Sequence, residues 1–188
     1  FSVAGLGIVA GAISKADLSH SESRLAMDTI MRRAEILAKK PKPTEILTVD
    51  NPCDGVYLYL KLLKRDPERA KAVLEVLKWN GGGANGSGVT LSNIDWKGNI
   101  HPDQFWQDLT IANIRQTPFS KVWTEGKHPV LAGLRNRLPL LRGRCGACSW
   151  KDTCGGGFRV RALRATGDMW EADPACYLTD EEISQRVK

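Results

Sequence analysis

Four of the five cysteines in this chain of 188 residues lie in its last quarter, at spacings that could bind a metal. Cys145, Cys148, Cys154 and Cys176 form the pattern C-x2-C-x5-C-x21-C. Two cysteines separated by two residues can place both thiolates on one centre, and neighbouring glycines let the backbone fold tightly. No histidine occurs in 129–188, which excludes a mixed cysteine and histidine site within this segment. Four thiolates suit either tetrahedral zinc or a 4Fe-4S cluster, and the spacing leaves both open.

Basic side chains are concentrated around these cysteines. Between residues 141 and 165, six cations stand against one acidic residue, Asp152. Such cations could offset the negative charge of a thiolate-bound cluster and raise its reduction potential. The fifth cysteine, Cys53, stands apart in the sequence; it could also lie near a functional pocket, but an incidental buried thiol is the expectation. The six cations are Arg142, Arg144, Lys151, Arg159, Arg161 and Arg164.

Three helices are expected in the first half of the chain. Ser19 and Glu22 have the spacing of a capping box, and apolar residues then recur at helical intervals up to Lys39. The apolar run 55–64 predicts a second helix. An Asp-Pro pair predicts the start of a third, which covers 67–80.

Two apolar segments in the same half are interpreted as buried strands. One is the opening segment, 1–14, and the other is EILTV at 45–49. The second strand would place Asp50 and Asn51 at its carboxyl end, where α/β folds carry their functional loops. Helices and strands together predict an α/β unit over 1–84.

A smaller α+β unit is expected over 85–188, after a glycine-rich connector. A β-hairpin should open it, with strands at 89–95 and from Ile100 onward. Short helices are predicted at 118–125 and 128–136, followed by the loop-rich segment that contains the cysteines.

The composition is that of an ordinary globular protein, with 42% hydrophobic and 26% charged residues. A formal net charge of +6 favours acidic partners without choosing among them. The apolar segments are too short to cross a bilayer, so we expect a cytoplasmic protein with no membrane partner.

The cysteine segment resembles a known enzyme family. The stretch GRCGACSWKDTCGGGFRVRA, followed by TGDMWEADPACYLTDEE, is similar to the C-terminal region of radical S-adenosylmethionine (SAM) enzymes with a SPASM or shortened twitch extension. The phrases TVDN, DPERAK, HPDQFW and LPLLRGRC are most similar to the tetrapyrrole-tailoring branch, which serves d-type heme and siroheme-dependent heme biosynthesis. The resemblance covers residues 44–183.

This resemblance implies that the four cysteines hold one auxiliary 4Fe-4S cluster. Full SPASM domains bind a second, but Phe158 and His101-Pro102-Asp103 stand where the family has further cysteines. The C-x3-C-x2-C motif of the SAM cluster is also absent, so SAM and a second 4Fe-4S cluster are expected only in an intact enzyme. The resemblance then implies late strands and helices of a partial (β/α) barrel plus a twitch-like domain, unable to cleave SAM alone.

In the family, a 5′-deoxyadenosyl radical abstracts hydrogen from a side chain of an iron-containing tetrapyrrole, and the substituent then leaves. The resemblance thus implies a tetrapyrrole substrate and an electron donor protein, with no nucleic acid. Arg159 and Arg161 are candidates to bind the substrate carboxylates. A solvated cationic face or a charge pair with Asp168 or Asp173 explains these arginines as well.

Three further side chains are weaker candidates for the substrate pocket. His101 could donate a proton or bind the substrate iron, although a histidine in a hairpin is more often structural. Asp50 and Asn51 are candidates through their predicted position after a strand.

Two rival functions remain open from the sequence. In one, the cysteines bind structural zinc and the basic face recognises nucleic acid or an acidic protein. In the other, the chain is part of a peptide-modifying SPASM enzyme that grips a leader peptide. A brown, air-sensitive protein would favour iron–sulfur over the zinc module.

Overall fold

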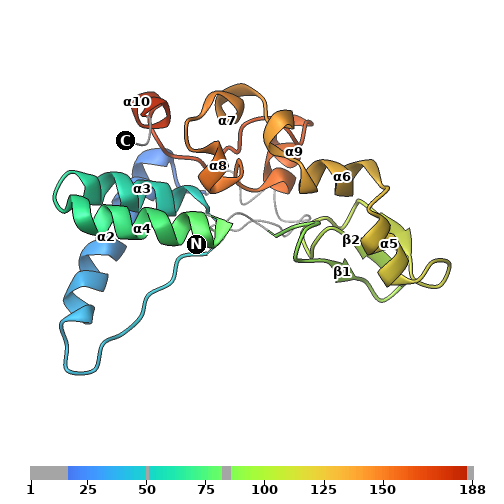
Figure 1. The fold of residues 1–188 in the computed structure, drawn as a ribbon, viewed down its shortest axis with the longest axis horizontal. Helices are drawn as coiled ribbons and strands as arrows, with labels where there is room; N and C mark the ends of the chain where they lie inside the picture. Colours follow the sequence, from blue (N-terminus) through green and yellow to red (C-terminus); the bar gives the residue numbers. More distant parts are fainter. Residues whose placement is uncertain (1–16, 50, 82–85, 186–188) are drawn as a thin grey trace.

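The computed structural model describes residues 17–49, 51–81 and 86–185, and within them helices predominate over one small antiparallel sheet (Figure 1). The predicted strand at 1–14, Asp50 and the predicted boundary at residue 84 lie outside the described residues. The helices are α2 (His20–Ala38), α3 (Cys53–Leu63), α4 (Pro67–Trp79), α5 (Phe119–Glu125), α6 (Pro129–Arg135), the 3₁₀ turn η2 (Leu138–Leu140), α7 (Gly143–Ala147), α8 (Lys151–Cys154), α9 (Arg159–Thr166) and α10 (Asp180–Ser184). The strands are β1 (Asn93–Ile94), β2 (Asn99–His101) and β3 (Ala112–Asn113).

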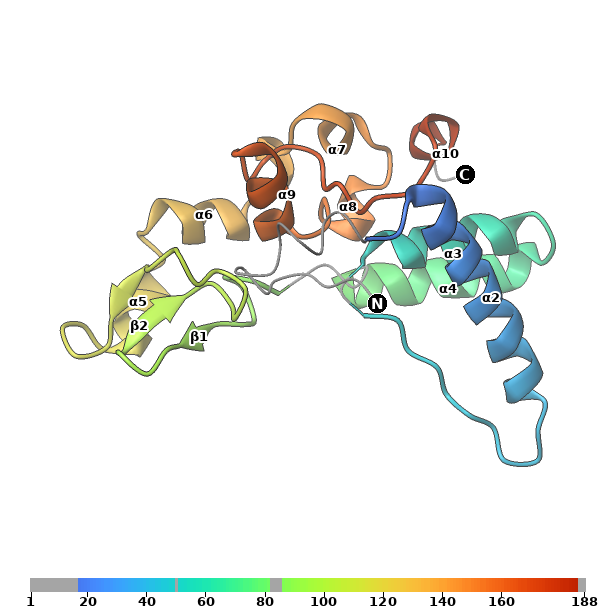
Figure 2. The same ribbon diagram turned by 180° about the vertical axis from the view of Figure 1, so that it is seen from behind.

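The three helices predicted in the first half are confirmed. The Ser19 side chain accepts from the Glu22 backbone N–H, and Glu22 bonds back to the Ser19 N–H, so α2 begins with the predicted capping box. Asp66 caps α4, whose first residue is proline. Helices α3 and α4 pack against each other, and α2 lies beside them in both views (Figures 1 and 2).

The strand predicted at 45–49 is wrong. This segment is irregular, and every one of its residues is exposed to solvent. A strand needs a neighbour to satisfy its backbone N–H and C=O groups, and among the described residues no strand pairs with 45–49. The α/β assignment is therefore supported only at the level of a mostly helical chain with a small sheet.

The predicted hairpin is confirmed, with a shorter first strand and an added third one. Ile94 pairs with Ile100 of β2, and Ile100 pairs on its other side with Ala112 of β3. The backbone N–H groups of residues 89–91 donate to the Gly86 carbonyl in a turn, and Leu91 forms an isolated bridge with Ser87 rather than part of the hairpin ladder. Gly88, with φ 70°, supports that turn and delays the strand until Asn93.

Two hydrophobic clusters hold these elements together. The larger cluster joins α2, α3 and α4 to the cysteine segment through Trp150, Tyr177, Leu178 and Ile183. The helices of the first half therefore share a core with residues from the last quarter. The smaller cluster centres on Trp106 and joins the segment after the hairpin to α6 and α9.

The ribbon shows the resulting arrangement. Helices α7, α8 and α9 lie between the α2–α4 helices at one end and the sheet with α5 at the other (Figures 1 and 2). None of the described helices is long and apolar enough to cross a membrane.

Candidate metal centre

Two short helices present three of the four clustered cysteines. Cys145 lies in α7, Cys148 caps its end, and Cys154 is the last residue of α8. Gly155, Gly156 and Gly157 follow, all with φ between 62° and 79°. L-residues with side chains disfavour this left-handed region, so the glycines let the chain reverse directly beside the third cysteine.

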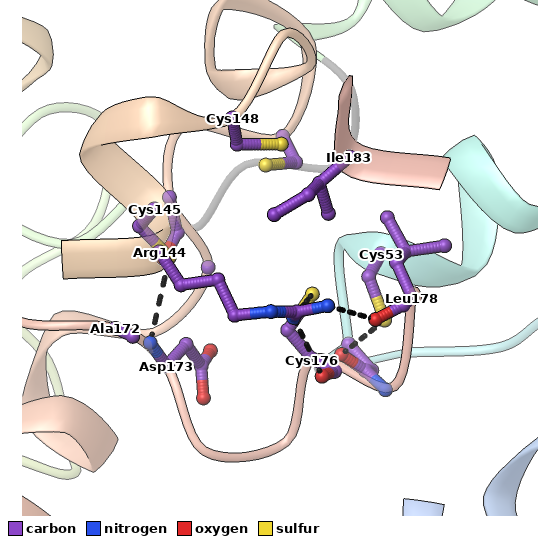
Figure 3. Close-up of a pocket in the computed structure, with 13 residues that line it drawn as sticks. Cys53, Arg144, Cys145, Cys148, Ala172, Asp173, Cys176, Leu178 and Ile183 are labelled. Carbon is purple, nitrogen blue, oxygen red and sulfur yellow. Dashed lines mark hydrogen bonds between the residues drawn. The ribbon is translucent and has the colours of Figure 1, made fainter. Parts of the chain in front are cut away.

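The fourth cysteine arrives from a distant segment and completes a common pocket. Cys176 lies in the loop between α9 and α10, and it lines the same cavity as the other three (Figure 3). The cavity has about 30 Å³ of interior space, above the roughly 10–15 Å³ that one water molecule occupies on this measure. Apolar side chains, Ala172, Leu178 and Ile183, form part of the remaining wall.

The four sulfur atoms surround this cavity without meeting at a point. Among the residues that the structure describes, no group of three or more histidine, cysteine or acidic side chains is arranged to hold a metal ion. A single zinc needs four sulfurs at about 2.3 Å. A four-iron cluster is larger and binds each cysteine through a different iron, so its ligands stand further apart. The described side chains therefore do not form a ready-made single-ion site.

Hydrogen-bond donors point at three of the sulfurs. The Trp150 N–H lies 3.3 Å from Cys148 Sγ, and the Asp173 N–H lies 3.5 Å from Cys145 Sγ. Arg144 Nη1 lies 3.8 Å from Cys176 Sγ. Donors to sulfur stabilise thiolate ligands, so these contacts fit a thiolate-bound centre.

The thiol pKa values differ within the pocket. Burial raises the pKa of Cys145 and Cys148, and it raises the pKa of Cys154 to about 12. A hydrogen bond with the Cys53 side chain lowers the pKa of Cys176, while the pKa of Cys53 rises. Because metals bind the thiolate, loading the site would release protons from the three thiols with raised pKa.

The structure places Cys53 in this pocket, which the sequence analysis did not expect. It lies in the first turn of α3, buried, and contacts Asn51 and the Ala175 carbonyl. Because Cys53 lies 92 residues before Cys145 in the sequence, no local sequence pattern indicates that the two are close in space. The larger hydrophobic cluster, which packs α3 against the loop around Cys176, brings the fifth thiol to the other four.

Arg161 forms the internal charge pair that the sequence analysis offered as an alternative. Its Nε lies 2.6 Å from Asp173 Oδ1, and both side chains are largely buried. Asp173 also accepts the Phe158 and Ala175 backbone N–H groups. The pair thereby ties the start of α9 to the loop that carries Cys176.

Arg159 is buried and bonds to main-chain carbonyls. Its guanidinium donates to Gly156, Met169 and Glu171. Burial lowers the pKa of Arg159, and the nearby thiols and Asp173 counter this effect. These bonds give Arg159 a structural role beside the pocket.

The remaining predicted substrate residues fall in different places. His101 is buried in β2, with Nδ1 2.7 Å from the Leu109 carbonyl and Nε2 3.5 Å from Asp95 Oδ2. Asn51 lines the cysteine pocket and donates to the Ala175 carbonyl. The structure thus brings Asn51 to the cysteines and places His101 on the sheet.

The chain is similar to curated enzymes of tetrapyrrole biosynthesis. It is 51% identical over 170 residues to the Fe-coproporphyrin III synthase of Methanosarcina barkeri, a match covering 89% of this chain and 42% of that enzyme. It is 44% identical over 167 residues to the pre-heme d1 synthase of Dinoroseobacter shibae, covering 88% and 41%. The AdoMet-dependent heme synthase of M. barkeri is 42% identical over 64 residues, covering 34% and 17%. No family model and no solved structure matches the chain.

These matches agree with the resemblance carried by the cysteine segment. The chain spans about two fifths of the length of the first two relatives, so the match fits one part of a longer enzyme. The three relatives are named for the synthesis of Fe-coproporphyrin III, of pre-heme d1 and of heme, and the third is also named for its dependence on AdoMet. The matches therefore confirm the predicted similarity to the heme-biosynthesis branch of the radical SAM enzymes.

Proposed function

We propose that this chain supplies the auxiliary-cluster part of a radical SAM enzyme that modifies side chains of an iron-containing tetrapyrrole. Cys145, Cys148, Cys154 and Cys176 would each bind one iron of a 4Fe-4S cluster. The observation that carries the proposal is their convergence on one cavity from two helices and a distant loop. When bound, the cluster would supply a site that accepts or relays an electron.

The substrate class rests on the relatives. Two of them are named for an iron coproporphyrin and for a precursor of heme d1. By analogy we propose that the intact enzyme acts on a siroheme-derived tetrapyrrole and draws electrons from a donor protein. Asn51, the candidate residue that lines the cysteine pocket, is the best placed to contact a substrate near the cluster.

Metal analysis of the 188-residue chain tests the metal centre. The protein should be purified and reconstituted with iron and sulfide under anaerobic conditions, since aerobic handling lets zinc replace iron. We expect a brown protein with about four irons and four sulfides per chain and a reducible cluster. A colourless protein with stoichiometric zinc after anaerobic reconstitution would instead support the structural zinc module.

Turnover by an intact homologue tests the substrate. A full-length enzyme that contains this segment should convert didecarboxysiroheme in the presence of SAM and a reductant. Modification of a peptide in place of the tetrapyrrole would support the peptide-modifying alternative. The two assays are independent, because the cluster can be present whichever substrate is used.

A further inference from the structure

Arg144 connects the first and last cysteines of the pocket. It precedes Cys145 in α7, and its side chain extends across the cavity toward Cys176 (Figure 3). There Nη1 lies 3.5 Å from the Cys176 carbonyl and 3.8 Å from its Sγ. The same guanidinium donates to the Leu178 carbonyl, and Nε lies 2.9 Å from Asp180 Oδ1.

These bonds reach alternate residues of one segment, which runs from the Cys176 loop to the first residue of α10. Residues 176, 178 and 180 all receive a bond from one rigid, planar group, which has five N–H donors in a fixed geometry. Twenty-one residues separate Cys176 from Cys154, so local chain geometry alone cannot position this segment. From the other side, Tyr177 donates to Asp54 and Asn51 donates to Ala175.

The charge of Arg144 adds a second effect. Its side chain is 32% exposed, so solvent screens it only in part. A cation that donates to a ligand sulfur stabilises the more negative, reduced state of a cluster. Removing it should therefore lower the reduction potential.

We propose that Arg144 is a positioning residue of the cysteine site, which holds the Cys176 loop against α7 and raises the reduction potential of the cluster bound there. This inference rests on the proposed cluster for its redox part. The positioning part does not depend on metal, since every bond involved lies within the chain.

Three variants of the full chain separate charge from geometry. R144Q removes the positive charge and most of the N–H donors of the planar guanidinium. R144K keeps the positive charge but loses the planar set of donors. R142Q is the matched control, because Arg142 stands two residues away with 65% exposure and pairs with Asp168, near the start of the α9–α10 loop, rather than with residues 176–180. Circular dichroism establishes that each variant is folded before it is compared.

Hydrogen–deuterium exchange on metal-free protein tests the positioning. Amides of residues 174–180 should exchange at least severalfold faster in R144Q and R144K than in wild type, and R142Q should match wild type. Equal exchange in R144Q and R142Q overturns the positioning role. This result is obtained whether or not the chain binds a cluster.

Potentiometry on the reconstituted protein tests the charge. At the midpoint potential of the wild-type cluster, the ratio of reduced to oxidised cluster should be about tenfold lower in R144Q than in wild type. For a one-electron couple this corresponds to a reduction potential lower by about 59 mV. The ratio in R144K should fall less, and that in R142Q should stay within about twofold of wild type. A ratio in R144Q equal to that in R142Q overturns the redox role. A wild-type chain that takes up no iron would instead contradict the proposed function.

Discussion

At the scale of single residues, the pocket contains five thiols, one more than a four-iron cluster needs. Cys53 and Cys176 lie side by side, and Cys53 also contacts Asn51 and the Ala175 carbonyl. Cys176 belongs to the C-x2-C-x5-C-x21-C pattern, whereas Cys53 lies outside that pattern and its thiol donates to the Asn51 side chain. We therefore expect Cys176, and not Cys53, to be a ligand.

Replacing the two cysteines in turn tests this assignment. Cys176→Ala should remove one ligand, leave a three-iron cluster or none, and lower retention of iron against a chelator by at least about tenfold. Cys53→Ala is the matched control, since it removes a thiol from the same wall, and its iron content should equal that of wild type. Iron analysis and EPR after anaerobic reconstitution distinguish them. If iron were lost in Cys53→Ala but not in Cys176→Ala, Cys53 rather than Cys176 would be the ligand.

At the scale of elements, the turns after α8 and α9 depend on glycine for different reasons. Gly157 and Gly167 have φ of 78° and 81°, so alanine is strained at either position. A Cβ at Gly157 would also collide with the Asp173 carboxylate, whereas a Cβ at Gly167 would meet nothing within 4 Å. The two positions thus separate backbone strain from a steric clash.

Alanine at these two positions should have unequal costs. Gly167→Ala should lower the free energy of unfolding by about 1 kcal/mol through backbone strain alone. Gly157→Ala should lower it by about 3 kcal/mol, because the Asp173–Arg161 pair must also move. Urea denaturation followed by circular dichroism measures both. Equal losses of unfolding free energy in the two variants would mean that the Asp173 side chain can move away from the new Cβ at no cost.

The docking of α10 on α2 should make stability depend on pH. Arg24 bonds to Glu182 at 2.7 Å and 2.9 Å, and this hydrogen bond lowers the pKa of Glu182 from 4.5. Because the folded-state pKa is depressed, the pair stabilises the protein fully above the unfolded value. That contribution is lost as the pH falls through the folded-state pKa.

Glu182→Gln tests this pair, since glutamine can still accept the Thr179 N–H bond that caps α10. The substitution should cost about 1 kcal/mol at pH 7 and remove the loss of stability that the pair causes as the pH falls below the unfolded-state pKa of Glu182. The exposed Glu125–Lys127 pair offers the control, and Glu125→Gln should change the free energy of unfolding by less. Urea melts at several pH values supply the comparison, and an unchanged acid dependence in Glu182→Gln would rule out this pair as its source.

At the scale of the whole molecule, one core links the first and last parts of the chain. Trp150 is buried between α3 and the cysteine segment, close to Tyr59, and its Nε1 donates to the Glu182 carbonyl. Helices α2–α4 should therefore lose structure together with the cysteine segment. A protein of two independent units divided near residue 84 would instead unfold in two steps.

Trp150→Ala tests this coupling. It should lower the free energy of unfolding by about 3–5 kcal/mol, and helix content and protection of α7 and α8 should be lost in one transition. Trp96→Ala is the control, because that side chain is 86% exposed. Circular dichroism and hydrogen exchange, recorded over the same urea series, provide the two probes. A cysteine segment that melts while α2–α4 persist would contradict the shared core.

The sequence by itself determined the features that depend on neighbouring residues. Helix starts at Ser19 and Pro67 were predictable because capping is a local interaction. The spacing of Cys145, Cys148 and Cys154 likewise identified the segment that could bind metal, and its resemblance to radical SAM enzymes agrees with the relatives.

Only the tertiary structure decided which distant residues meet. The run 45–49 has the composition of a strand, yet strand formation depends on a pairing partner that a local pattern does not reveal. Cys53 and Arg144 gained their places beside Cys176 through packing of α3 and α7 on a loop far along the chain. From the sequence, Arg161 could pair with a substrate carboxylate or with Asp173. The fold buries the Asp173 carboxylate beside Arg161 and so pairs the two. Long-range burial and charge pairing, which no short window of sequence contains, therefore built the pocket from the cysteines that the sequence supplied.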